Sequence, residues 1–408
     1  MHTAWLRSAT TQQRRALLAA SLGWMLDSMD FMIYSMVLAY MMKDLGMSKP
    51  VAGLLSSFSQ VAAAVGGLVF GVIADRYGRT RAMIGSITVY SIFTAACGFS
   101  QTITQLAVLR VIVGFGLGGE FASGAALVSE TWPSEHRGKA LGIVHSSWAV
   151  GYAVAAAATG IILPRWGWRG VFFVGALPAL LTLWIRRSVE EPAIWREGRH
   201  RSTADAGRMS QLFSPAFVRF TVALTLLNAG SLFAYWGFNS WNPAYLSLPT
   251  AEGGIGLSAG AMSSFVILMQ VSTFIGYLSF GVLSDRFGRR RSYITYLVVA
   301  ALLLLLYPAT RSPWALLLLG SGVGFFGTGF YAGFGAVVSE LFPTAIRARA
   351  LAFTYNVGRV VSAVAPFTVG SLAESKGFGI GFAILAGALL FGALMWLFLP
   401  ETRGRELT

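Results

Sequence analysis

Long apolar segments alternate with short polar segments along almost the whole chain. Each apolar segment has about 20 residues or more, which as a helix crosses a hydrocarbon core of about 30 Å. The pattern predicts twelve membrane-spanning helices, over residues 16–42, 51–74, 82–102, 105–129, 138–163, 168–186, 216–246, 257–283, 292–311, 314–340, 347–373 and 378–400. The expected fold class is therefore an all-α membrane protein.

The polar segments of the first half recur in the second half at an offset of 210 residues. The corresponding residues are Gly71 and Gly281, Asp75 and Asp285, Arg79 and Arg289, Glu130 and Glu340, Pro133 and Pro343, and Arg137 and Arg347. A polar loop repeated at fixed register between apolar segments indicates two homologous membrane halves. We expect an N-terminal six-helix bundle over 1–186, a cytoplasmic linker over 187–213 and a C-terminal six-helix bundle over 214–408.

Composition agrees with a membrane location, because 55% of the residues are hydrophobic and only 12% are charged. With the N-terminus placed in the cytoplasm, most of the 31 Lys and Arg residues fall in cytoplasmic segments. This predicts a multi-pass protein of the inner (plasma) membrane with both termini cytoplasmic. The net charge of +14 is spread over many short loops, so nucleic acid is not an expected partner. The single Cys97 excludes an internal disulfide and indicates no metal site.

The doubled motifs resemble those of the major facilitator superfamily, and the resemblance covers essentially the whole chain. Two further segments are similar to the proton-coupled metabolite symporters, a branch that includes carriers of sialate, lactate and other carboxylates. These segments are Arg110-x-x-x-Gly114-x-Gly116-x-x-Gly119-Glu120-Phe121 and Tyr355-Asn356-x-Gly358-Arg359. The resemblance implies the major facilitator fold, alternating access, no enzymatic activity and no cofactor, with the proton as coupling ion.

The repeated loop motifs are expected to gate one side of the carrier. The carboxylates of Asp75 and Asp285 can accept hydrogen bonds from a helix N-terminus and pair with the arginine that follows. Small residues at the start of the motif permit close helix approach. The gating residues predicted are Gly71, Asp75, Arg79, Glu130, Arg137, Gly281, Asp285, Arg289, Glu340 and Arg347. The alternative is that these charges only anchor the loops.

Ionisable residues at membrane depth are costly unless paired or hydrated, and they mark candidate proton sites. Asp27 and Asp30 lie three residues apart in the first apolar segment, so they share a helix face. Arg110 begins the fourth segment, from which its long side chain could reach Asp30, and Glu120 lies deeper in the same helix. In sugar porters an Asp of the first helix and an Arg of the fourth form the proton-coupling pair, which the resemblance implies for Asp30 and Arg110. The alternative is a structural ion pair that holds helices together.

The remaining polar groups suggest a binding site for a small anion. Arg359 lies near the middle of the eleventh segment without an acidic residue close to it on that helix, and a substrate carboxylate would supply its anion. The other predicted substrate-binding residues are Asn356, His145, Trp148, Tyr152, Tyr34, Asn228, Tyr235, Trp236, Asn239, Gln270 and Tyr331. The aromatic members could equally serve packing or the membrane interface.

One glycine-rich segment imitates a nucleotide-binding motif. Gly114 to Gly119 satisfies the pattern Gly-x-Gly-x-x-Gly, but it lies within an apolar helix and follows no strand. The spacing of Gly114 and Gly118 instead predicts close packing against another helix. No catalytic triad or zinc ligand set is present in the sequence, so an enzyme is not expected.

The sequence therefore predicts a proton-coupled symporter of a small organic anion, a monocarboxylate, that works as a monomer in the bilayer. One alternative is a proton-driven exporter or antiporter of amphiphilic compounds. A second is a sugar-type proton symporter, because Pro400 to Gly404 resembles the corresponding segment of sugar porters. A third is a nutrient sensor that does not transport.

Overall fold

The computed structural model describes residues 6, 8–192 and 209–403 of the 408-residue chain, and every regular element in them is a helix. Residues 193–208 of the expected linker lie outside the described residues. The chain divides into two compact units. The first comprises Met1–Met47, Phe58–Ser202 and Ala259–Ser264, and the second comprises Ser48–Ser57, Thr203–Ser258 and Phe265–Thr408.

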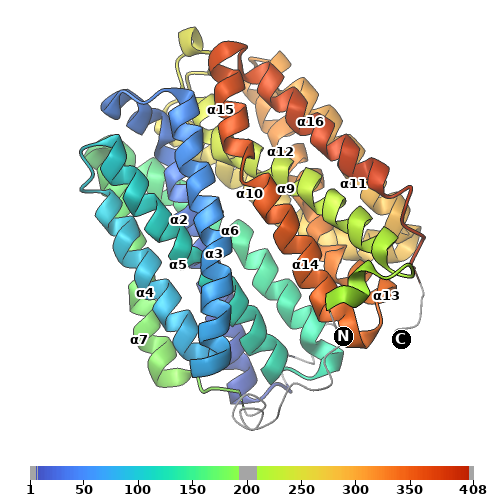
Figure 1. The fold of residues 1–408 in the computed structure, drawn as a ribbon. Coiled ribbons are helices and arrows are strands. Elements are labelled where there is room, and N and C mark those ends of the chain that lie inside the picture. The colour runs from blue at the N-terminus through green and yellow to red at the C-terminus, as the bar shows by residue number, and fades with distance from the viewer. Residues whose placement is uncertain (1–5, 7, 193–208, 404–408) are drawn as a thin grey trace. The chain divides into compact units, whose positions relative to one another are not determined.

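The helices of the first half of the chain supply most of the first unit (Figure 1). They are α2 (Thr11–Leu45), α3 (Lys49–Tyr77), α4 (Arg79–Cys97), α5 (Ile103–Thr131), α6 (Ser134–Phe173), η1 (Val174–Ala176) and α7 (Pro178–Ser188). α2 begins with a reciprocal cap, in which the side chains of Thr10 and Gln13 each accept a hydrogen bond from the other's N–H. α2 packs against α5 and α6, and α4 packs against α5.

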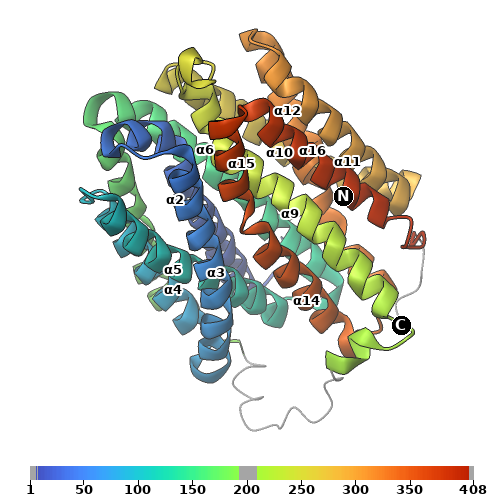
Figure 2. The ribbon, with the colours of Figure 1, turned by 45° about the horizontal axis from the view of Figure 1, so that its top comes forward.

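The second unit is built mainly from the helices of the second half (Figure 2). They are η2 (Met209–Phe213), α9 (Val218–Ser247), η3 (Thr250–Glu252), α10 (Ala259–Phe287), α11 (Arg289–Leu306), η4 (Tyr307–Ala309), α12 (Pro313–Gly329), η5 (Phe330–Gly333), α13 (Phe334–Leu341), α14 (Thr344–Ser362), α15 (Ala365–Ser375) and α16 (Phe378–Met395). α9 packs against α14, α15 and α16, and α11 packs against α12 and α16.

Helix boundaries repeat at the same offset as the sequence motifs. α3 and α10 each contain 29 residues and begin at Lys49 and Ala259. α4 and α11 begin at Arg79 and Arg289, again 210 residues apart. The duplication seen in the loop motifs therefore extends to the helices on either side of those loops.

Nine helices among the described residues are long and apolar enough to cross a membrane. One of them, His136–Ser188, covers two expected spans, because α6, η1 and α7 follow one another with non-helical backbone at Gly167. The remaining two expected spans, 82–102 and 347–373, correspond to α4 and to the pair α14 and α15, which fall short in length or apolarity. The second of these spans is broken between Ser362 and Ala365.

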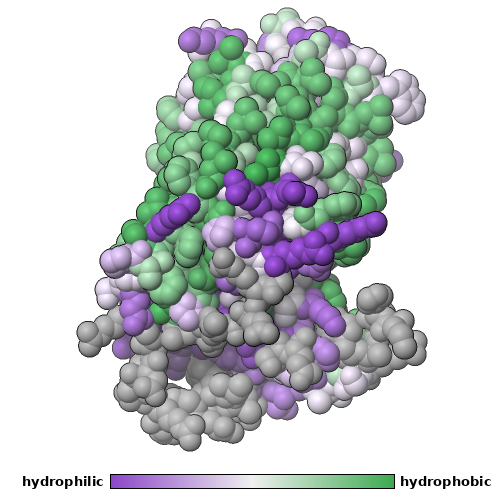
Figure 3. All heavy atoms as spheres, turned by 90° about the vertical axis from the view of Figure 1, so that its right-hand side faces the viewer, coloured by the Kyte–Doolittle hydropathy of each residue, from purple (hydrophilic) through white to green (hydrophobic). Residues whose placement is uncertain are grey.

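Many large apolar side chains remain exposed along the helices. Leu68, Val282 and Leu318 are 73%, 69% and 72% exposed. Figure 3 shows a broad apolar surface bordered by hydrophilic side chains. Water would disfavour such a surface, whereas the hydrocarbon of a bilayer accommodates it.

Two glycines of α5 allow it to pack closely on α3. A Cβ built on Gly118 would lie 1.9 Å from the main-chain oxygen of Ala63, and one on Gly114 would lie 2.2 Å from that of Ser59. No side chain fits at such distances. The predicted close packing at Gly114 and Gly118 is confirmed.

The prediction of close helix approach at the two motif glycines is wrong. A Cβ built on Gly71 or Gly281 meets no atom within 4 Å. The close contacts of α3 and α10 lie earlier in each helix, at Gly66 and Gly276, where a built Cβ would lie 1.9 and 2.5 Å from a main-chain oxygen. Phe70 and Phe280, one residue earlier, still pack against Gly119 and Gly333, so the motif glycines lie on a face of the helix that meets no neighbour.

Candidate functional site

The motif of the first half forms a network around one arginine. Arg79 pairs with Asp75, one helical turn earlier, and lies 2.8 Å from Glu130 at the end of α5. Its Nε also donates to Glu130 at 3.1 Å. The arginine side chain is only 13% exposed. Arg79 therefore joins the loop between α3 and α4 to α5.

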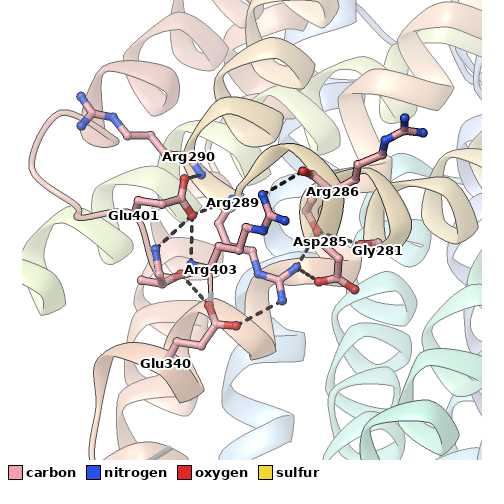
Figure 4. A network of polar contacts seen from close by, with 10 residues as sticks. Gly281, Asp285, Arg286, Arg289, Arg290, Glu340, Glu401 and Arg403 are labelled. Atoms are coloured by element: carbon pink, nitrogen blue, oxygen red, sulfur yellow. Dashed lines mark hydrogen bonds and ion pairs between the residues drawn. The ribbon is translucent and has the colours of Figure 1, made fainter. Parts of the chain in front are cut away.

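Figure 4 shows the corresponding network of the second half. Arg289 lies 2.5 Å from Asp285 and 3.1 Å from Glu340. It also donates to the hydroxyl of Ser284 at 2.7 Å. The first half has Ala74 at that position, so this additional contact belongs to the second half.

A glutamate near the end of each half caps the helix that begins at this arginine. The Glu191 carboxylate accepts from the N–H groups at the start of α4, at 2.7 Å from that of Arg79. Glu401 accepts from the N–H groups at the start of α11, at 2.8 Å from that of Arg289. These N–H groups have no partner within the helix and carry partial positive charge, which a carboxylate satisfies.

The sequence predicts that Asp75 and Asp285 cap these helices, and that prediction is wrong. Both aspartates lie in the last turn of the preceding helix, α3 or α10, and pair with the arginine side chain, with their own side chains 73% and 68% exposed. The N–H groups bond to Glu191 and Glu401 instead.

Burial acts to raise the pKa of the Glu401 carboxyl, but hydrogen bonds from main-chain N–H groups outweigh it and hold that pKa below its ordinary value. The donors are the N–H groups of Arg403, Arg289, Arg290 and Thr402. The Thr402 hydroxyl also donates to Glu340, which joins this cap to the ion-pair network.

The two remaining gating candidates contact the main chain at the end of the preceding helix. Arg137 Nη2 lies 3.5 Å from the carbonyl oxygen of Trp132. Arg347 Nε lies 3.4 Å from that of Phe342. The two contacts correspond between the halves, and they place both arginines at the turn that follows α5 or α13.

Asp30 and Arg110 are fully buried in the first unit, with exposures of 0% and 1%. No Asp30 oxygen and no Arg110 guanidinium nitrogen has a partner at hydrogen-bond distance among the described residues. The Thr94 side chain of α4 is a polar group close to Asp30 in its surroundings. The guanidinium lies over the ring of Tyr34, 4.6 Å from its centroid. Arg110 and Asp30 interact electrostatically at longer range. The contact expected between these two charges is thus replaced here by a cation–π contact.

The other two buried acids lie along the same helix interface. Asp27 of α2 is 4% exposed, and Glu120 of α5 is 1% exposed. The two interact electrostatically. Glu120 Oε1 packs directly against Gly23, one turn before Asp27. Three carboxyl groups therefore lie in the interior of the first unit.

The three predicted substrate residues of α6 differ in exposure. Trp148 and Tyr152 are buried, at 7% and 1%, whereas His145 is exposed. Trp24 of α2 joins them, with its ring 4.7 Å from that of Trp148 and 6.4 Å from that of His145. These rings offer a flat apolar surface that ends in an imidazole.

A small cavity in the second unit brings together three predicted substrate residues. Tyr235 and Asn239 of α9 and Gln270 of α10 line it, together with Thr273 and Thr328. Its volume of about 20 Å³ accommodates a water molecule and not an organic substrate. The cavity therefore adds a polar recess to this unit.

Tyrosines connect this recess to Arg359. The ring of Tyr331 lies 6.2 Å from that of Tyr235, and its hydroxyl is within electrostatic range of Tyr277 and Tyr355. Tyr355 in turn lies near Arg359, whose buried Nε has no hydrogen-bond partner among the described residues. Hydroxyl donors beside a guanidinium form a group that can recognise an organic anion.

The other predicted substrate residues of this unit are Trp236, Asn228 and Asn356. The ring of Trp236 lies 5.2 Å from that of Tyr235. Asn228 packs against Gly358, next to Arg359, with 2.7 Å between its Cβ and a Cβ built on that glycine. Asn356 is exposed and donates to the carbonyl of its own helix at 2.8 Å.

Comparison with known proteins decides the family. The profile of the Major Facilitator Superfamily matches residues 20–279 and 228–408. The chain belongs to this superfamily. As a major facilitator protein it is a multi-pass membrane transporter and not an enzyme, as its sequence predicts.

Two relatives and one solved structure align with this major facilitator protein over nearly its whole length. It is 34% identical over 412 residues to a probable 4-methylmuconolactone transporter of Cupriavidus pinatubonensis. The alignment covers 98% of this chain and 94% of the relative. It is 33% identical over 393 residues to the cis,cis-muconate transport protein of Acinetobacter baylyi, covering 95% and 94%. The crystal structure of a D-xylose-proton symporter superposes with a TM-score of 0.82 at 19% identity, covering 97% and 100%. The predicted fold class, with twelve helices in two homologous bundles, is confirmed.

Sequence reasoning missed four residues that the geometry brings to these groups. Glu191 and Glu401 are themselves 210 residues apart, so the duplication was a signal that could have identified them as partners of the motif. Tyr355 stands in the segment Tyr355-Asn356-x-Gly358-Arg359, which was a signal for it. Tyr277 carries no comparable signal, because a tyrosine in a membrane helix is most often a packing or interface residue.

Proposed function

We propose that this major facilitator chain is a proton-coupled symporter of a small organic carboxylate, and that it works by alternating access between its two halves. The observation that carries the proposal is the burial of Asp30 and Arg110 without hydrogen-bond partners among the described residues. An unpaired charge inside a membrane protein costs several kcal/mol, so such groups are tolerated where they exchange a proton or an ion. In this scheme Asp30 binds the proton and Arg110 adjusts its affinity.

The two repeats support a division of labour. Among the described residues, the fully buried Asp, Glu and Arg side chains are Asp27, Asp30, Arg110 and Glu120, all from the first half. At the offset of 210, Arg110 and Glu120 correspond to Gly320 and Phe330. We assign proton binding to the first half, with Asp27 and Glu120 assisting Asp30. Substrate binding depends chiefly on the second half.

The proposed substrate is a flat, unsaturated monocarboxylate. Arg359 would pair with the carboxylate, and the nearby tyrosine rings would stack on a conjugated body. The names of both relatives refer to unsaturated organic acids, which supports a conjugated carboxylate; muconate has two carboxylates and methylmuconolactone has one. A lactone acid carries one carboxylate, which matches the single guanidinium in the tyrosine cluster.

The ion-pair networks would act as latches on the cytoplasmic side. With both termini cytoplasmic, the loops that carry Arg79 and Arg289 lie on the same side of the membrane and follow the positive-inside rule. Each latch ties a loop to a helix end through a few charged contacts, which can break and reform during the cycle.

Purified protein in liposomes tests this proposal. The substrate panel comprises 4-methylmuconolactone, cis,cis-muconate, benzoate, benzamide and xylose, with an imposed gradient that makes the lumen alkaline. We expect accumulation of at least one carboxylate and none of benzamide or xylose. Accumulation of xylose alone, or of no compound in the panel, would overturn the proposed substrate class.

The direction of transport separates a second candidate function. The aromatic contacts around Tyr235 and Trp236 would also suit an amphiphilic compound, which favours a proton-driven exporter. Such an exporter would release substrate from preloaded liposomes as protons enter. Net uptake in the direction of the proton gradient contradicts it.

A further inference from the structure

Glu120 lies in a narrow slot between α2 and α5 that is shaped by glycines. A Cβ built on Gly23 of α2 would lie 2.2 Å from Glu120 Oε1, and one on Gly124 would lie 3.2 Å from the same atom. Ala20 and Met83 close the slot beside Gly124, each 3.4 Å from that built Cβ. We call this space the glycine slot. Any side chain at position 23 would displace the Glu120 carboxyl.

The glycine slot is unsuited to an ionised carboxylate. Glu120 is 1% exposed, and neither of its oxygens has a hydrogen-bond partner among the described residues. The groups that face it are Asp27 of α2 and Tyr90 of α4, and both interact with it electrostatically. His145 of α6 contacts the ring of Trp24, with 6.4 Å between the ring centroids. Neither Asp27 nor Tyr90 supplies a positive charge beside Glu120. An ionised Asp27 would repel an ionised Glu120 carboxylate.

The duplicated half provides an independent indication. Phe330 occupies the position that corresponds to Glu120, and it is 2% exposed. The same place in the fold therefore accepts an entirely apolar side chain. A carboxyl group that replaces a phenylalanine at a buried helix interface fits best when it is protonated and neutral.

We propose that Glu120 is a second proton-binding residue of the carrier and that Gly23 is the positioning residue that makes room for its protonated form. This inference rests on the proposed proton symport and adds a site separate from Asp30. When Glu120 is protonated, the carboxyl lies in the glycine slot and α2 packs closely on α5. When the proton leaves to water, the carboxylate requires hydration or a cation and cannot remain there.

The consequence is a link between a proton and the position of α2. Asp27 and Asp30 both lie on this helix, so a change in its packing on α5 also changes their surroundings. Loss of the proton from Glu120 would loosen the contact of α2 with α5 at Gly23. A symporter with two such sites can bind a second proton in the same cycle without any further group.

Infrared difference spectroscopy of the full-length protein in liposomes tests the slot without a substrate. A protonated buried carboxyl gives a C=O stretching band that disappears as pH rises. We expect Glu120→Gln to remove one titrating component of this band. We expect Gly23→Ala to move that component to lower pH by about one unit, a tenfold change in proton affinity, because the displaced carboxyl reaches a more polar place.

Two controls keep the test specific. Gly142→Ala adds the same methyl group on α6 where a built Cβ meets no atom within 4 Å, and it should leave the band unchanged. Gly23→Ala in the Glu120→Gln background should have no further effect on the titration. If Gly23→Ala does not fold, Gly124→Ala provides the same test with a smaller displacement. A band that Glu120→Gln leaves intact, or that responds alike to Gly23→Ala and Gly142→Ala, would overturn the proposal.

Failure here is distinguishable from failure of the proposed function. If Asp30→Asn abolishes accumulation while the Glu120 component is missing from the wild type, proton symport stands and the second site is rejected. If the Glu120 component of the C=O band titrates and responds to Gly23→Ala, but no substrate accumulates with protons, the proton site at Glu120 is retained and proton symport is rejected.

Discussion

Glu191 and Glu401 perform the same structural role 210 residues apart, since each carboxylate caps the helix that begins at the motif arginine. Each glutamate follows the last helix of its half, whereas the capped helix is the third of that half. The cap therefore connects the segment after the last helix of each half to the start of its third helix. In the second half Thr402 extends this closure to Glu340.

Removal of the caps should destabilise the halves unequally. We expect Glu191→Ala to reduce the free energy of unfolding by about 1 kcal/mol, as for the loss of other helix caps. Glu401→Ala should cost less, because Glu401 is exposed and solvent screens its charge. Thermal unfolding in detergent, with Glu252→Ala as an exposed control, measures both. An equal or larger loss for Glu252→Ala would contradict the capping role.

The contribution of Glu401 should depend on pH. Its folded-state pKa lies below the ordinary value of 4.5, so folding favours the ionised form. The stabilisation is complete above the ordinary value and is lost as pH falls through the lower folded-state pKa. The difference in unfolding temperature between wild type and Glu401→Gln should thus be present at neutral pH and shrink below about pH 4.5. A difference that grows on acidification would show that the sign is wrong.

Much of the fold could be predicted from the sequence because a bilayer imposes a simple rule. Apolar segments of spanning length must be helices, and the repeat at Asp75 and Asp285 fixes the number of halves. The break between Ser362 and Ala365 was missed although the sequence carries a signal for it, because Pro366 at the start of α15 cannot continue the preceding helix. The open space at Gly71 was beyond prediction, since the sequence does not say which face of the helix meets a neighbour at that level; Phe70 packs against Gly119, and Gly71 does not.

Loss of a latch should slow transport more than it weakens binding. Asp75→Asn or Arg79→Ala removes ion pairs at the end of α3, and these residues lie outside the groups assigned to the substrate. We expect a lower maximal rate with little change in substrate affinity, because the latch biases the conformational equilibrium. Initial-rate transport and equilibrium binding on the same preparation separate the two effects. Equal losses of rate and affinity in a folded variant would contradict the gating role.

Asp30→Asn should uncouple transport from protons. The amide keeps the shape of the carboxyl but cannot bind and release a proton, so accumulation under a pH gradient should be lost. Exchange of labelled for unlabelled substrate needs no net proton movement and should remain measurable. Arg110→Lys tests the partner, because it keeps the charge and loses the flat guanidinium that lies over Tyr34. Accumulation at the wild-type level by Asp30→Asn would remove this residue from the mechanism.

The sequence placed the candidate site only in outline. It identified Asp30, Arg110 and Glu120, because charged residues within apolar segments stand out. It did not give the position of the Arg110 side chain over Tyr34, which depends on how α2 and α5 pack. Tyr277 could not be found either, since its interaction with Tyr355 arises only when α10 and α14 pack in one unit.

The charge carried in each cycle should identify the substrate class and the role of Arg359. A monocarboxylate moved with one proton gives an electrically neutral cycle. A membrane potential, which otherwise contributes about 2.3 kcal/mol per charge per 100 mV, should then have no effect on accumulation. The pH gradient alone should drive uptake, at about 1.4 kcal/mol per unit. If Glu120 carries a second proton in the same cycle, uptake of a monocarboxylate becomes electrogenic and uptake of a dicarboxylate becomes neutral.

The same liposomes measure the contribution of Arg359. Arg359→Ala should weaken binding of the carboxylate at least tenfold more than binding of its amide analogue, because only the anion pairs with the guanidinium. Arg359→Lys should restore part of the difference, since it keeps the charge but not the bidentate geometry. Arg349→Ala is a suitable control, because this arginine is on the same helix, about three turns earlier. Electrogenic uptake of a neutral compound that is unaffected by Arg359→Ala would overturn both the substrate class and the role proposed for this residue.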